Sequence, residues 1–387
     1  MALNKKDEAA VRDATYYAVA LHQDGKEIRF HEDYDLVKNL IGIHRVMERI
    51  IPSKAPLFRW HEHPKKSLPV QWGDGRIKPV TLGKALMDQL PMNIDALKIE
   101  FPERDFHPLV KLFGDYSVEL HWNATSCLKG DFNHLNRLVE KMRREGRDKA
   151  FQNRRDKRLA SIRDATKGLR KITDEVFHRC GSSLVVRLDL SYRIDKWRPS
   201  RFSVKDPTNL ISNEQSRAHR EAFIRFLKRK YPLPLLMYAW KKERGRCTSY
   251  QYRLLLFFAG DVPVSGYVVG NEIGQHWVND ITGGEGSFNN CNAGGHQQTG
   301  IGLINRWETE KIKALKEIVI PRLTMSDYYI RVISKGRIYQ PGGLPPKPRR
   351  APGRPRKYRP LASPGVKDCL NKPLPDPLPS DFLKNWR

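Results

Sequence analysis

The sequence predicts an α+β fold in which an antiparallel sheet is backed by helices. Apolar and polar side chains alternate through residues 183–192, which is the pattern of a strand with two different faces. Residues 250–258 form a mostly apolar run that is typical of a buried strand. Residues 213–230 place apolar side chains at helical spacing, behind a capping box of Ser212 and Gln215. A helix between two strands, with short links, favours a sheet with helices packed on it.

Residues 1–130 are expected to form an N-terminal mixed module, to which the sequence assigns no role. Residues 16–21 and 117–122 have the alternation of extended segments, and residues 35–50 have the spacing of a helix. Frequent Pro and Gly residues interrupt the rest of this region.

Residues 131–179 are expected to form a basic helical linker. Between residues 134 and 179 the chain carries 15 Lys+Arg and 7 Asp+Glu, and the apolar stripe is thin. Breaks in the helix are expected near Gly146 and Gly168. Two interpretations stay open at this point: a solvated linker, or a basic helix that lies along phosphate groups.

Residues 180–340 hold the compact α+β region. Besides the three elements that open this section, the sequence predicts a strand at 235–240 and helices at 271–281 and 308–320. The glycine-rich residues 283–286 lack the spacing of a phosphate-binding loop, and we interpret them as a turn.

Residues 341–387 are expected to be a disordered basic tail, because proline is too frequent there for a packed core. The tail contains a Gly-Arg-Pro core flanked by cations, which resembles an AT-hook. Proline keeps such a segment slim and extended, so its arginines reach into a narrow A·T minor groove. Sequence-independent phosphate binding and a simple spacer are the alternatives. The DNA-binding candidates in the tail are Arg349, Arg350, Arg354, Arg356 and Lys357.

The charge of the chain indicates the class of its partner. The sequence holds 70 Lys+Arg against 43 Asp+Glu, a formal net charge of +27, which suits a nucleic acid. A membrane is not expected as a partner, because no run approaches the roughly 18 apolar residues of a membrane span. The first residues lack the apolar core of a secretory signal, so we expect a cytoplasmic protein. The five cysteines are scattered, with neither zinc-ligand spacing nor a disulfide framework.

Six sequence blocks follow one another in the second half of the chain. They are VVRLDLSY (185–192), the tryptophan-bearing strand that ends at Trp240, LLLFFAG (254–260), IGQHW with ITGGEGSFNNCNA (273–293), GIGLI (300–304), and LTMSDYYIRV with KGRIY (323–339). In this order and spacing they resemble the YagK/YfjJ C-terminal domain family, the inovirus gene-two type replication proteins. The resemblance covers about residues 180–345, near half of the chain.

The resemblance implies a fold and a chemistry similar to those of rolling-circle initiators of the HUH type. In those enzymes two histidines on one strand hold a divalent metal, Mg²⁺ or Mn²⁺, which polarises a phosphodiester. A tyrosine on a nearby helix, with a lysine three residues later, attacks the phosphorus. In this sequence the histidine positions read Gln251 and Arg253, and the helix reads Arg-Leu-Thr-Met at 322–325.

The candidate site residues follow from the resemblance. Tyr328 and Tyr329 are the candidate nucleophiles, and a buried or base-stacking ring is the alternative for each. Asp189 is the candidate metal ligand, while Arg187 and Arg253 are candidate contacts to DNA phosphates. A structural ion pair is the alternative for Asp189 and Arg187.

The resulting expectation is a DNA-binding replication-initiator-like protein of an inovirus or integrated element. Its catalytic form would be a rolling-circle nickase with a degenerate active site, a metal-dependent tyrosine endonuclease and strand transferase. The alternatives are a non-enzymatic DNA-binding regulator and an RNA-binding or interaction module. The missing histidines favour binding over cleavage, and the sequence leaves the oligomeric state open.

Overall fold

The structure is a computed structural model of the chain, which divides into two units, Met1–Pro345 and Pro346–Arg387. It describes residues 3–61 (without 4, 20, 24–25 and 29–30), 77–94 (without 93), and 103–193 (without 126–128). It further describes residues 211–261 (without 233 and 245–249), 264–293 and 300–343. All of these lie in the first unit.

A six-stranded antiparallel sheet confirms the predicted α+β class. Its three long strands are β6 (Ser182–Tyr192), β7 (Leu235–Arg244) and β8 (Tyr250–Ala259), and the main strand order is β10-β6-β8-β7-β12. The outer side of β6 pairs with β10 (Gly302–Asn305) along its first residues and with β9 (Gly286–Asn290) along its last ones. The short strand β12 (Tyr339–Pro341) completes the sheet beside β7.

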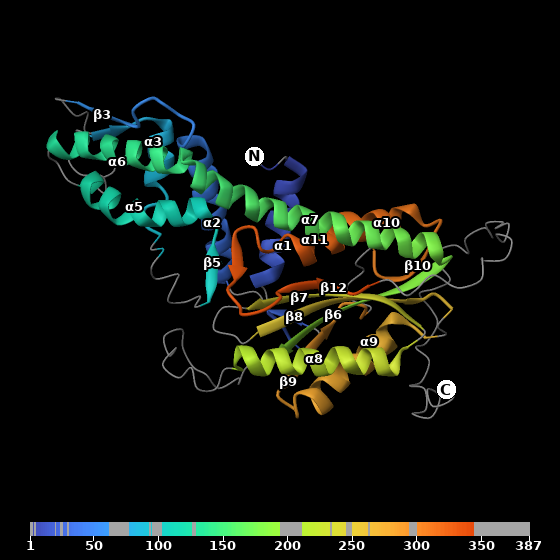
Figure 1. Ribbon diagram of the computed structural model, residues 1–387. Helices are drawn as coiled ribbons and strands as arrows, with labels where there is room; N and C mark the ends of the chain where they lie inside the picture. The colour runs from blue at the N-terminus through green and yellow to red at the C-terminus, as the bar shows by residue number, and fades with distance from the viewer. Residues whose placement is uncertain are drawn as a thin grey trace. The chain divides into compact units, whose positions relative to one another are not determined.

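Two helices cover the apolar face of this sheet, as Figure 1 shows. Helix α8 (Asn213–Lys230) begins where the Ser212 hydroxyl accepts the Gln215 N–H at 3.0 Å, as the capping box predicts. Helix α9 (Gly266–His276) continues into the π-helical turn η3 (Trp277–Ile281). The buried side chains of this core include Phe223, Leu227, Ile273, Trp277, Leu188, Leu254 and Trp240.

The turn between η3 and β9 depends on glycine. Gly283 and Gly284 have φ angles of 59° and 94°, in the left-handed region that favours glycine. The prediction of a turn at residues 283–286 is therefore confirmed.

The other face of the sheet carries α7 (Lys149–Arg179) together with α10 (Thr309–Ala314), the π-helical turn η4 (Leu315–Val319) and α11 (Ile320–Thr324). The Asp148 carboxylate caps α7 by accepting the N–H groups of Ala150 and Phe151, so the predicted break near Gly146 is confirmed. Gly168 lies inside α7, and the predicted break there is wrong.

Residues 131–179 do more than link two regions. Leu169 and Val176 of α7 are buried with Val185 and Leu255 of the sheet, while Leu159 and Ile162 are buried in a second, helical core. The interpretation of a solvated linker is therefore wrong, because one side of α7 is buried along most of its length.

The helical core belongs mainly to the first part of the chain. Its helices are α1 (Lys5–Val19), α2 (His31–Ile50), α3 (Thr81–Met87), α5 (Pro108–Thr125) and α6 (Lys129–Arg147). Three strand pairs accompany them: β1 (Leu21–Gln23) with β2 (Lys26–Ile28), β3 (Phe58–Trp60) with β4 (Ile77–Pro79), and β5 (Arg104–Phe106) with β11 (Ile330–Val332). The chain thus returns to this region near its described end.

Two buried arginines hold the helical core together. Arg143 of α6 donates to the carbonyls of Ile50 and Ala55, which closes the end of α2. Arg158 of α7 donates to the carbonyls of Phe106 and Asp327 and so fastens α7 to the β5–β11 pair. Backbone oxygens, together with the carboxylates of Glu140 and Asp105, satisfy these two cations inside the protein.

Two segments expected to be extended are wholly or largely helical. In the segment 16–21, residues 16–19 end α1 and Leu21 begins β1, while residues 117–122 lie in α5. In α5 the buried side chains Leu109, Phe113 and Leu120 recur at the helical period, whereas Val118 and Trp122, which suggested alternation, are exposed. No helix in the described part of the chain is both long and apolar enough to cross a bilayer.

Candidate functional site: a buried ionic cluster and an exposed basic face

Charged side chains gather on one half of the sheet face opposite α8. They come from alternate positions of neighbouring strands, so the pleat points them to the same side. Arg187 and Asp189 lie on β6, Arg253 on β8, and Lys241 and Glu243 on β7. All five are at most 4% exposed, and we call them the sheet cluster.

Arg253 is the centre of the sheet cluster. Its Nη1 lies 3.2 Å from Asp189 Oδ2, and its Nε donates to Glu243 Oε2. The arginine is 0% exposed, and the side chains of the two carboxylates are 5% and 4% exposed. One guanidinium thus compensates two buried carboxylates, which a fixed planar fork of donors does well.

The loop that contains Ser326 and Asp327 covers the sheet cluster. Ser326 donates its hydroxyl to Glu243 Oε1 at 2.6 Å, and Asp327 accepts from Lys241 Nζ. Lys241 is 2% exposed, so its charge also needs this partner. Strand β1 and the end of α1 lie against the same sheet, near β6, β9 and β7.

Arg187, the remaining member of the sheet cluster, is buried and does not face solvent. It is 2% exposed, and its backbone N–H donates to Asn292 Oδ1 at 2.9 Å. The arginine therefore lies inside the protein, as Arg253 does. In this structure neither guanidinium is placed where a DNA phosphate could reach it.

The sheet cluster does not fit a divalent metal. Asp189 and Glu243 are the carboxylates nearest to the positions that carry histidine in the resembled family, and the guanidinium of Arg253 already lies against both. A permanent cation between two carboxylates repels a second cation and occupies one oxygen of each carboxylate. The described residues contain no group of three metal-binding side chains either. Asp189 is thus placed as an ion-pair partner of Arg253.

Tyr328 and Tyr329 lie in the helical core, away from the sheet cluster. They are 2% and 0% exposed, and the Tyr328 hydroxyl hydrogen-bonds His44 Nε2 at 3.0 Å. Burial raises the pKa of both phenols well above the ordinary value, which disfavours a phenolate nucleophile. The ring of His107 lies 4.5 Å from that of His44 and 4.9 Å from that of Tyr328. The structure does not bring either tyrosine to Asp189.

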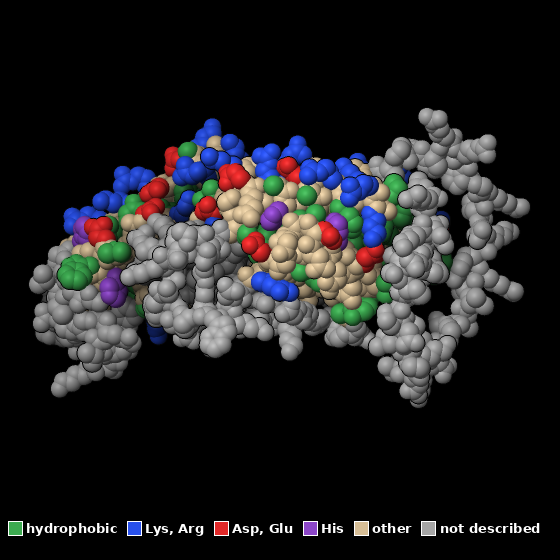
Figure 2. All heavy atoms as spheres, turned by 90° about the horizontal axis from the view of Figure 1, so that it is seen from below, with side chains coloured by type: hydrophobic (Ala, Val, Ile, Leu, Met, Phe, Trp, Pro, Cys, Tyr) green, Lys and Arg blue, Asp and Glu red, His purple; other side chains and the backbone are tan. Residues whose placement is uncertain are grey.

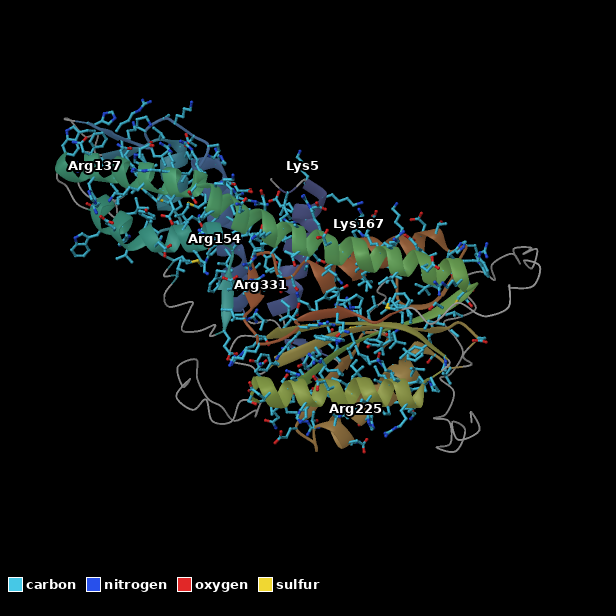
Figure 3. The ribbon with its side chains drawn as sticks, viewed as in Figure 1. Lys5, Arg137, Arg154, Lys167, Arg225 and Arg331 are labelled. Carbon is cyan, nitrogen blue, oxygen red and sulfur yellow. The ribbon has the colours of Figure 1, made fainter. Side chains whose placement is uncertain are left out.

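A second candidate site is the outward side of α6 and α7, which we call the basic face. Figure 3 labels Arg137, Arg154 and Lys167 along it. Its exposed cations are Arg137, Lys141, Arg144, Arg147, Lys149, Arg154, Lys157, Lys167 and Lys171.

The exposed cations of the basic face outnumber the exposed acids of the same two helices. In the described part of the chain, none of them lies within ion-pair distance of a carboxylate. Three of the exposed acids are occupied elsewhere: Glu140 binds Arg143, Asp148 caps α7, and Asp174 binds Lys316. Glu145, Asp156 and Asp164 are exposed on the same helices. Figure 2, which views the molecule from below, shows Lys and Arg side chains along its upper margin with Asp and Glu side chains among them. The basic face therefore holds a surplus of positive charge.

The tail candidates Arg349, Arg350, Arg354, Arg356 and Lys357 lie outside the described residues.

Two members of the sheet cluster were not identified from the sequence. Lys241 and Glu243 escaped notice because the strand was expected to end at Trp240, whereas β7 continues to Arg244. The alternation of Ala239, Lys241 and Glu243 on one face was the signal that could have extended it.

Comparison with known proteins found no matching family model, no matching curated protein and no matching solved structure.

Proposed function

We propose that this chain binds DNA through phosphate contacts, as a replication-initiator-like protein that binds without cleaving. The observation that carries the proposal is the basic face. Among the described residues its exposed cations lack carboxylate partners. Except for Arg147, which donates to the Ile51 and Ser53 carbonyls, they are available to replace the counterions of a phosphate polymer.

The spacing of the basic face suits an extended ligand. The exposed cations run from Arg137, midway along the 19-residue α6, to Lys171, in the last third of the 31-residue α7. A helix advances about 1.5 Å per residue, so the exposed cations of α7, from Lys149 to Lys171, extend over roughly 33 Å. Such a length is close to one turn of duplex DNA, about 34 Å.

The sheet cluster and the tyrosines support binding over cleavage. The position that would supply a metal-binding histidine supplies Arg253, which is buried between Asp189 and Glu243. The candidate nucleophiles Tyr328 and Tyr329 are buried in a different core. The proposal thus uses the resemblance to HUH-type initiators only for the antiparallel sheet with helices on its faces, and not for an active site.

Duplex DNA is preferred over RNA in this proposal because of the AT-hook-like segment at Arg354 and Arg356. The test is fluorescence anisotropy with four labelled ligands: an A·T-rich duplex, a G·C-rich duplex, single-stranded DNA and single-stranded RNA. The proposal expects tightest binding to the A·T-rich duplex, weakening steeply with salt. Preference for RNA would support an RNA-binding module instead. Absence of binding to all four ligands at low salt would refute the proposal.

A further inference from the structure

A second concentration of positive charge lies on another part of the fold, in a pocket of about 310 Å³. Its walls are the first half of α8, the end of β7 and the loop at residues 334–340. Its volume falls at the lower end of the roughly 300–1,000 Å³ typical of small-molecule sites. The cations that line it are Arg217, Arg220, Lys242, Lys335 and Arg337.

The pocket has far more cations than anions. Glu221 is the only carboxylate among its described lining residues, and it pairs with Arg217 and Arg220. Lys335 and Arg337 are exposed, and neither has a carboxylate partner in the described part of the chain. Like charges held together raise the energy of the empty pocket, and an anion would relieve it.

Lys242 forms the rigid floor of the pocket. It is 2% exposed, its Nζ donates to Asn213 Oδ1, and it lies 3.6 Å from the centre of the Tyr250 ring. Ser334 Oγ also donates to Asn213 Oδ1, at 2.7 Å, which fastens the loop to the first residue of α8. These contacts hold the pocket in shape without a ligand.

Arg220 is fixed in the same way. Its guanidinium carbon lies 4.3 Å from the centre of the Trp240 ring, and its Nη2 bonds Glu221 at 3.1 Å. The backbone N–H of Lys242 donates to the Ile338 carbonyl at 2.7 Å, so strand and loop keep their spacing. Preorganised donors bind an anion with little loss of conformational entropy.

We propose that this pocket, which is lined by Arg220, Lys242, Lys335 and Arg337, binds a phosphate group. Arginine forks and a lysine ammonium are the donors that recognise phosphate oxygens. A phosphomonoester carries up to two negative charges, which matches the surplus of cations better than a carboxylate does. The phosphate comes either from a free phosphate ester or from the phosphorylated end of a nucleic-acid strand.

The test uses the full chain and a variant of the two exposed loop cations, Lys335→Gln with Arg337→Gln. Binding of inorganic phosphate is measured by isothermal titration calorimetry. The variant is expected to bind about tenfold more weakly or worse, because hydrogen bonds to a charged ligand are lost. The matched control is Arg225→Gln with Arg229→Gln, two exposed cations of α8 outside the pocket. The control removes the same charge and is expected to bind phosphate as the unchanged chain does.

Equal weakening in both variants would refute the pocket and indicate a general charge effect. Failure of the unchanged chain to bind millimolar phosphate would refute it as well. A second readout is the pKa of Lys242, which burial and the neighbouring Arg220 lower to about 8. NMR titration is expected to show that bound phosphate raises this pKa, and an unmoved pKa would contradict the proposal.

Short oligonucleotides with a 5′-phosphate or a 5′-hydroxyl distinguish the two sources. Tighter binding of the phosphorylated strand, lost in the Lys335→Gln, Arg337→Gln variant, assigns the pocket to a strand end. Equal binding of the two strands, together with binding of inorganic phosphate, assigns it to a free phosphate ester. The phosphate assay stands apart from the DNA assays, so the pocket and the basic face are tested separately.

Discussion

Replacement of Arg253 by methionine tests whether this arginine is a structural ion-pair partner. The substitution keeps most of the side-chain volume and leaves Asp189 and Glu243 without the guanidinium that lies against both. Removing one partner of a buried ion pair costs about 3–5 kcal/mol, because the other charge stays buried and uncompensated. Here two carboxylates, 5% and 4% exposed, lose the same partner, so we expect the upper half of that range.

Urea unfolding followed by tryptophan fluorescence measures the effect, since Trp240 and Trp277 are buried in the adjoining core. A triple variant with Arg253→Met, Asp189→Asn and Glu243→Gln is the matched control, because it removes all three charges together. We expect it to recover most of the lost stability. The triple variant should also bind DNA as the unchanged chain does, because Arg253 is not exposed. A loss below about 1 kcal/mol in Arg253→Met, or weaker DNA binding by a stable triple variant, would refute this reasoning.

Four further predictions concern acid stability, cleavage, the phosphate pocket and the tail. Burial, followed by Arg155, lowers the pKa of His44 from 6.5 to about 3, so the unfolded chain takes up the proton first as pH falls below 6.5. His44 alone should therefore lower the free energy of unfolding by about 2 kcal/mol between neutral pH and about pH 5, and His107, whose pKa burial also lowers, acts in the same direction. Equal urea midpoints at the two pH values would contradict this. Supercoiled plasmid with Mg²⁺ or Mn²⁺ should yield no covalent protein–DNA adduct; an adduct that disappears in Tyr328→Phe or Tyr329→Phe would restore the nickase interpretation. Phosphate binding should weaken as pH rises through about 8, because Lys242 loses its proton there; burial, Arg220 and Arg244 lower its pKa, and Glu103 and Glu214 raise it. Calorimetry at several pH values measures this. Truncation after Gly343 should reduce the salt dependence of DNA binding by about 0.9 per lost phosphate contact, and an unchanged slope would show that the tail does not contribute.

The sheet and its helices were largely predictable because their signals are local. Helix α8 covers residues 213–230 as the spacing and the Ser212 cap indicate. Strands β6 and β8 match the runs at 183–192 and 250–258 to within a residue at each end. Periodicity and capping depend on neighbours a few residues away, so one sequence contains them.

The sheet cluster was not predictable because its contacts are distant in sequence. Arg253 and Asp189 are 64 residues apart, and Lys241 and Asp327 are 86 apart. A charged residue read alone indicates solvent exposure, and only the paired strands show that its charge is compensated inside. The burial of Tyr328 and Tyr329 was not predictable for the same reason, because the residues that cover them, such as His44 of α2, are distant in sequence.

The central claim is that the basic face of α6 and α7 binds DNA phosphates. The most direct measurement is the salt dependence of duplex binding for a variant with Arg137→Gln, Arg154→Gln and Lys167→Gln. The matched control changes Arg225, Lys228 and Arg229 of α8, on the other face of the sheet (Figure 3). We predict that the slope of log binding constant against log salt falls by up to about 2.7 in the first variant and little in the second. Equal slopes in the unchanged chain and the first variant would contradict the claim.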